Sequence, residues 1–108
     1  MRVGLAQVNP TVGDLVGNAA ALLREYAKAV DAGCHIVAFP ELSITGYPPE
    51  DLVLKPGFLA DNMRALNSVV EATGQCMAVI GFVDSVAVQV EGGEERILFN
   101  AAAVAQNG

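Results

Sequence analysis

The sequence predicts an α/β fold whose early strands pair in parallel and whose last strands pair antiparallel. Two apolar stripes at helical spacing alternate with short apolar runs, which is typical of strand–helix–strand units. A β-rich stretch interrupted by Glu91-Gly92-Gly93-Glu94-Glu95 follows, and such an interruption indicates a hairpin. The expected order is β-α-β-loop-α-β-β-β, within one domain at most, because the sequence has only 108 residues.

The first half supplies a strand, a helix and a second strand. Arg2 to Asn9 alternates and ends at Pro10, which predicts a strand closed by a turn. Asp14 can cap a helix that ends at Gly33. His35 to Phe39 is a continuous apolar run, as expected for a strand covered on both faces. The helix residues expected to be buried recur every three or four positions: Leu15, Ala19, Leu22, Leu23, Tyr26 and Val30.

The second half begins with an irregular segment from Pro40 to Lys55, in which a short helical turn is expected near Glu50–Leu54. A second amphipathic helix follows and ends at Gly74. Its expected buried residues are Leu59, Met63, Leu66 and Val70. Three strands are then predicted, over Cys76–Val83, Val86–Val90 and Arg96–Ala105.

Charge and composition exclude several classes of protein. Twelve acidic and six basic side chains give a formal net charge of −6, which argues against nucleic acid or an anionic membrane as a partner. No stretch approaches the ~20 apolar residues of a membrane-spanning helix. The start also lacks a secretory signal, so a cytoplasmic protein is expected. Two cysteines and one histidine offer no zinc-ligand spacing, and no metal site is predicted.

The composition and the last residues indicate part of a larger core. Charged residues make up 17% of the sequence, below the usual ~25%. A small chain also buries a smaller share of its apolar surface than a large one. Asn107-Gly108 is a strong two-residue hairpin turn that follows an apolar strand, and the partner strand is missing. We therefore expect residues 1–108 to be the N-terminal part of a longer domain.

Glu41 is the first candidate for chemistry. It lies just past the apolar run that ends at Phe39, at the carboxyl end of a strand, where open α/β sheets place ligand sites. Between Pro40 and Leu42 its carboxylate is expected to be partly desolvated, as suits a general base. A glutamate that only caps a helix or staples the loop is the alternative interpretation.

Two more candidates surround Glu41. Ser43 to Asp51 could form a site loop in which Tyr47 offers an aromatic face and a hydroxyl; the alternative is an ordered surface loop with Tyr47 packed down. Asn100 lies inside an apolar strand, where a buried amide needs hydrogen-bond partners. It is expected either to give structural support to the Glu41 loop or to face solvent.

Cys34, His35 and Cys76 lie at the starts of predicted strands, at the end opposite to Glu41. A nucleophilic cysteine needs a positive neighbour or a helix N-terminus, so these cysteines are expected to act as small buried hydrophobes. His35 has no second ligand in reach, and a structural or surface histidine is expected. No glycine-rich phosphate loop occurs, and no nucleotide site is predicted within these residues.

The segment that ends at Glu41 resembles a known motif. Gly33-Cys34-His35-Ile36-Val37-Ala38-Phe39-Pro40-Glu41 resembles the first catalytic motif of the nitrilase (carbon–nitrogen hydrolase) superfamily. Other parts of the same family are resembled by Leu5-Ala6-Gln7-Val8-Asn9-Pro10 with Val12-Gly13-Asp14 and Asn18, by Gly81-Phe82 and by Asn100-Ala101-Ala102. Leu42 to Leu52, with its run TGYPPEDL, is similar to the glutamine-hydrolysing domains that begin the glutamine-dependent NAD synthetases. The resemblance covers the whole length in order.

The resemblance implies a nitrilase-like α-β-β-α sandwich, of which residues 1–108 are the N-terminal portion, and a Glu-Lys-Cys triad. It implies that Glu41 is the general base and that Tyr47 lies near the bound glutamine and the ammonia exit. No lysine or cysteine of this sequence matches the family's other triad positions, so both are expected beyond Gly108. Residues 1–108 alone are therefore expected to be inactive.

The resemblance also implies the parent activity. Glutamine is the expected substrate, and its ammonia supplies ATP-dependent synthesis of NAD from nicotinic acid adenine dinucleotide. The glutaminase step needs no cofactor, whereas ATP and Mg²⁺ belong to a synthetase module absent from these residues. A homo-oligomer is expected. Two alternatives stay open: a stand-alone amidase of the same superfamily, and a non-catalytic binding or interaction module that uses its last strand as a partner edge.

Overall fold

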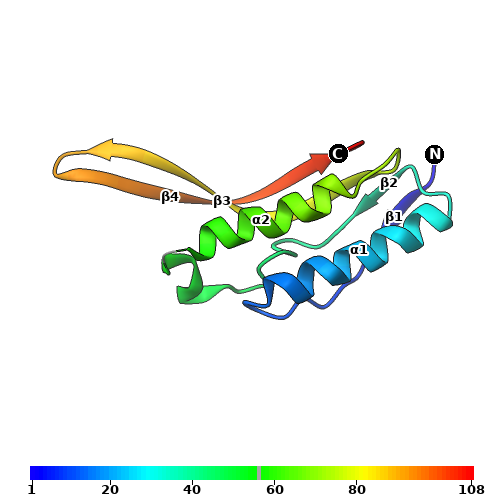
Figure 1. Ribbon diagram of the computed structural model, residues 1–108, viewed down its shortest axis with the longest axis horizontal. Coiled ribbons are helices and arrows are strands. Elements are labelled where there is room, and N and C mark those ends of the chain that lie inside the picture. The colour runs from blue at the N-terminus through cyan, green and yellow to red at the C-terminus, as the bar shows by residue number, and fades with distance from the viewer. Residues whose placement is uncertain (56) are drawn as a thin grey trace.

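The computed structural model describes residues 1–55 and 57–108. The elements in chain order are β1 (Val3–Leu5), α1 (Leu15–Asp31), β2 (Ile36–Ala38), the short 3₁₀ helix η1 (Glu50–Leu54), α2 (Phe58–Glu71), β3 (Met77–Val90) and β4 (Gly93–Ala105). The four strands form one sheet in the order β1-β2-β3-β4 (Figure 1). The first three pair in parallel and β4 pairs antiparallel with β3. The mixed α/β class and the change of strand direction are therefore confirmed.

The last part of the sheet differs from the expectation. Two strands were expected over Cys76–Val83 and Val86–Val90, but β3 runs through both, and its ladder with β4 is unbroken. The polar pair Asp84-Ser85 stays in the strand because ladder bonds use only the backbone, and the Asp84 carboxylate accepts the Ser85 N–H at 2.8 Å. The prediction of a break at this pair is wrong. The hairpin turn is also shorter than expected and contains only Glu91 and Gly92.

The helices α1 and α2 pack side by side and cover one face of the sheet (Figure 1). Their buried faces include the predicted Ala19, Leu22, Tyr26 and Leu66, but not every residue of the predicted stripes is buried. In α1, Ala29 is buried while Val30 is 48% exposed, and in α2, Val69 is buried while Met63 is 37% exposed. The shared core includes Leu22, Tyr26, Val37, Phe39, Ile44, Leu66, Val69, Ala78, Ile80 and Phe82. Among the described residues, no helix is long and apolar enough to cross a membrane.

The outer halves of β3 and β4 project beyond the helices as a two-stranded hairpin (Figure 1). We call residues 84–99 the β-arm. Residues 91–99 are all exposed, whereas β3 is buried from Ile80 to Val83. A two-stranded hairpin is only marginally stable by itself. The conformation of the β-arm therefore depends on how firmly its root, at Val83 and Asn100, is held.

Candidate active site

The structure brings Glu41 and Asn100 together at the carboxyl end of β2. Asn100 lies on β4, and its Nδ2 donates a hydrogen bond to Oε1 of Glu41 at 2.5 Å. Of the two expectations for Asn100, contact with the Glu41 loop is the arrangement observed. Both residues are exposed, so the partial desolvation expected for Glu41 from Pro40 and Leu42 is not found. The hydrogen bond from Asn100 is the polar contact that the structure records for this carboxylate.

Gly81 allows the loop that carries Glu41 to cross over β3. A Cβ atom at this position would lie 2.5 Å from the backbone N of Leu42 and 2.6 Å from the backbone O of Pro40. Real Cβ atoms essentially never approach so closely, so the crossing requires glycine. The carbonyl of Gly81 also accepts hydrogen bonds from the Ile44 N–H at 3.2 Å and the Ser43 hydroxyl at 3.3 Å. The loop is thereby fixed on β3.

Asn18 of α1 holds the same loop from its other side, and the sequence analysis did not single it out as a site residue. Its side chain is 4% exposed. Nδ2 donates to the carbonyls of Thr11, at 2.8 Å, and Ile44, at 2.9 Å, and Oδ1 accepts the Thr11 N–H at 2.8 Å. Its place four residues before Leu22, on the apolar stripe of the helix, is the pattern that could have revealed a buried amide.

Asn62 of α2 plays a similar part for β3. It is fully buried; its Nδ2 donates to the Val83 carbonyl at 2.7 Å, and its Oδ1 accepts the Val83 N–H at 3.4 Å. This carboxamide pairs with β3 as a neighbouring strand would, at a point beyond the residues that β2 pairs. Val83 stands opposite Asn100 in the sheet register. Asn62 therefore fixes the strand position from which Asn100 reaches Glu41.

Beside this contact lies a small hollow of about 200 Å³ whose walls are mostly apolar. It is lined by Leu42, Pro49, Val53, Val83, Leu98, Phe99 and Asn100. Tyr47, on the connecting loop, is 66% exposed and is not packed down. An oriented carboxylate next to an apolar hollow is a geometry in which a small polar substrate with an aliphatic stem could be held and deprotonated or attacked.

Comparison with known proteins identifies the family. Residues 2–108 match the carbon-nitrogen hydrolase family. The chain belongs to this family. That assignment and the observed mixed sheet agree with the nitrilase-like resemblance of the sequence.

Two relatives and one solved structure that this carbon-nitrogen hydrolase chain resembles carry the same name. A glutamine-dependent NAD(+) synthetase of Thermotoga maritima is 38% identical over the whole chain, which covers 18% of that protein. A second, from Rhodobacter capsulatus, is 49% identical over 60% of the chain and 12% of its own length. The structure of glutamine-dependent NAD+ synthetase from Acinetobacter baumannii in complex with ADP superposes with a TM-score of 0.80 at 33% identity. The superposition covers 97% of this chain and 18% of the Acinetobacter baumannii protein. The matched part thus spans less than a fifth of the length of each of these relatives.

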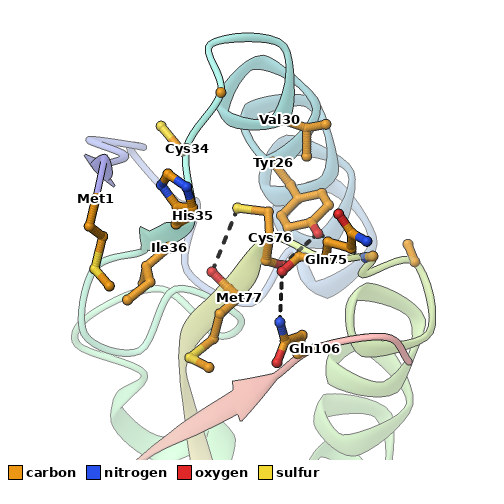
Figure 2. Close-up of a pocket in the computed structure, with 13 residues that line it drawn as sticks. Met1, Tyr26, Val30, Cys34, His35, Ile36, Gln75, Cys76, Met77 and Gln106 are labelled. Carbon is orange, nitrogen blue, oxygen red and sulfur yellow. Dashed lines mark hydrogen bonds between the residues drawn. The ribbon is translucent and has the colours of Figure 1, made fainter.

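The carbon-nitrogen hydrolase chain has a second, wider hollow of about 790 Å³ at the opposite end of the sheet (Figure 2). Cys34, His35 and Cys76 line it, so the structure places these residues away from Glu41, as expected. Nδ1 of His35 accepts the Arg2 N–H at 2.9 Å, which makes it a satisfied structural histidine.

The thiol of Cys76 is poorly suited to nucleophilic chemistry. Burial, and then the nearby Cys34, raise the pKa of the Cys76 thiol above its ordinary value. A thiol with a raised pKa stays protonated near neutral pH and attacks slowly. The hydroxyl of Tyr26 ties α1 to the start of β3. It donates a hydrogen bond to the Cys76 carbonyl at 2.7 Å and accepts one from the Gly74 N–H at 2.9 Å (Figure 2). The hollow is therefore a structural feature of the strand starts.

Within residues 1–55 and 57–108, no three His, Cys, Asp or Glu side chains gather where they could hold a metal ion. The sequence also contains no glycine-rich loop that could hold phosphates.

Proposed function

We propose that this chain forms the first part of a domain that hydrolyses the side-chain amide of glutamine, with Glu41 as its general base. The observation that carries the proposal is the Glu41 carboxylate, placed at the carboxyl edge of parallel strands and oriented by Asn100. The relatives that match the whole chain are named glutamine-dependent, which supports glutamine as the amide. The TGYPPEDL run supports a synthetase relative over a stand-alone amidase.

In the proposed reaction, Glu41 accepts the proton of a cysteine thiol that residues outside this chain supply. The thiolate attacks the amide carbon of glutamine, and a lysine, also from outside these residues, stabilises the oxyanion. The protonated Glu41 then returns the proton to the leaving nitrogen, and ammonia departs. Water, deprotonated by the same carboxylate, hydrolyses the thioester and releases glutamate. The ammonia would supply synthesis of NAD from nicotinic acid adenine dinucleotide in the parent enzyme.

The test is Glu41→Gln in the full-length protein, with glutamine-dependent and ammonia-dependent NAD synthesis measured side by side. We expect glutamine-dependent synthesis to fall by about 10²-fold or more, because a general base contributes about 10²–10⁴-fold. Ammonia-dependent synthesis should persist. Glu91→Gln, at the exposed turn of the β-arm, is the matched control and should change neither activity. Glutamine-dependent synthesis that survives Glu41→Gln would show that the base is a different residue.

The remaining expectations stay predictions. Tyr47 is proposed to contact glutamine because it lies on the loop that follows Glu41 and is exposed. Tyr47→Ala should then raise the KM for glutamine and leave ammonia-dependent activity unchanged. The inactivity of residues 1–108 alone, a homo-oligomeric state and a cytoplasmic location are likewise predictions.

A further inference from the structure

We propose that Asn100 is a positioning residue that holds Oε1 of Glu41, so that Oε2 is the oxygen left to accept a proton. This inference rests on the proposed function of Glu41. The two residues are 59 positions apart in the sequence, and the 2.5 Å hydrogen bond joins the loop after β2 to β4 across the intervening β3. A contact between such distant segments orients the carboxylate only if both of its ends are held.

Both ends are held by the same strand. The Glu41 loop is fixed at Gly81, where its backbone crosses β3 and its N–H and hydroxyl groups bind the Gly81 carbonyl. Asn100 stands opposite Val83, two residues farther along, and the buried amide of Asn62 binds Val83. The donor and the acceptor therefore share one short segment of β3 as their support. These backbone contacts alone would leave the side-chain torsions of Glu41 free; the hydrogen bond from the Asn100 amide restricts them.

An amide suits this role better than a charged partner. A lysine or arginine would favour the ionised carboxylate and make it a weaker base, whereas a neutral amide orients the carboxylate with less loss of basicity. The two ion pairs of the described residues are Lys28–Glu25 and Arg64–Asp61, and neither involves Glu41. Among the described residues, the contact that sets the direction of the exposed carboxylate is therefore the neutral amide of Asn100.

The test compares Asn100→Ala and Asn100→Asp in the full-length protein, with Asn67→Asp on the exposed side of α2 as a control for the added charge. Asn100→Ala should lower kcat for glutamine hydrolysis about tenfold or more, with little change in KM, since an undirected base loses part of the about 10²–10⁴-fold that it contributes. Ammonia-dependent synthesis should be unchanged. Asn67→Asp should leave kcat and KM as in the wild type.

Asn100→Asp gives the sharper readout because it places a second carboxylate against Glu41. Two such carboxylates resist double ionisation, so the acid limb of the kcat/KM profile should move to higher pH by about one unit or more. In the sequence, the surrounding elements also carry the ionisable residues Tyr47, Glu50 and Asp51 on the loop and η1, Asp84 on β3, and Glu94, Glu95 and Arg96 on β4. All of them are unchanged in this variant, and Asn67→Asp controls for the net charge.

The outcomes separate this inference from the function on which it rests. If Glu41→Gln abolishes glutamine hydrolysis but Asn100→Asp keeps the wild-type pH profile, the positioning role is wrong and the proposed base stands. If Glu41→Gln leaves hydrolysis intact, the proposed base itself is wrong. A shifted profile in Asn100→Asp with normal ammonia-dependent activity supports positioning. If Asn100→Ala fails to fold, the pH profile of kcat/KM in Asn100→Asp still decides whether Asn100 positions Glu41.

Discussion

Gly81→Ala should disable the candidate site from a position on β3, beneath the loop that carries Glu41. The new methyl group would lie 2.5 Å from the backbone N of Leu42 and 2.6 Å from the backbone O of Pro40. Both contacts are backbone atoms, which cannot swing aside as a flexible side chain does. The loop must retreat from β3 by about 1 Å to regain an ordinary contact distance. Glu41, which lies between these two residues, moves with it.

The magnitude follows from that displacement. Overpacking against a fixed backbone costs about 1–3 kcal/mol of the free energy of unfolding, and a displacement of about 1 Å at a reacting group can lower turnover about 10²-fold. The assay is kcat for glutamine hydrolysis in the full-length protein, together with a thermal melt. Gly74→Ala is the matched control, because a Cβ there meets nothing within 4 Å. It should leave kcat unchanged and keep or slightly raise stability.

A Gly81→Ala protein with the kcat and melting temperature of Gly74→Ala would refute the reasoning. That result would mean that the loop crosses β3 with room to spare, and that the Gly81 carbonyl contacts do not determine where Glu41 lies. A lower melting temperature with an unchanged kcat would separate the two effects. It would show that the crossing stabilises the fold without positioning the carboxylate.

Three further predictions concern the core and the thiols. Leu22 is fully buried, so Leu22→Ala should lower the free energy of unfolding in urea by about 2–5 kcal/mol, whereas Val16→Ala, at an 83% exposed position, should change it by less than about 0.5 kcal/mol. Asn18→Ala removes the amide donor of two loop carbonyls and should cost about 1–3 kcal/mol, measured the same way; a cost near zero would mean that water replaces the amide. The raised pKa of the Cys76 thiol means that the folded state retains its proton where the unfolded state loses it, so stability should fall as the pH rises above 9.0. Urea denaturation at increasing pH checks this, and Cys34→Ser should weaken the dependence.

Local patterns predicted most of the fold. The Asp14 cap, the helical stripes and the apolar run before Glu41 each depend on residues a few positions apart, and the structure has α1, α2 and β2 where these patterns place them. The carboxyl-edge rule likewise places Glu41 without knowledge of the tertiary structure. These features follow from spacing alone.

The rest depends on contacts between distant segments. The unbroken course of β3 is set by its pairing with β4, which overrides the polar Asp84-Ser85 pair. Asn18 and Asn62 are buried because they bind backbone groups of other elements, and a hydropathy pattern counts both as polar. The hydrogen bond from Asn100 to Glu41 depends on the sheet register. The sequence suggested that Asn100 could contact the Glu41 loop, but it could not give the geometry of the hydrogen bond.

The β-arm gives the candidate site a mechanical property. A hairpin attached at one end bends like a cantilever: its free turn at Glu91-Gly92 sweeps the widest path, and its root hardly shifts. Asn62 clamps β3 at Val83, opposite Asn100, so Asn100 lies at the fulcrum. We therefore expect bending of the β-arm to displace its turn much more than Asn100. The contact with Glu41 would then be largely insulated from motion of the turn.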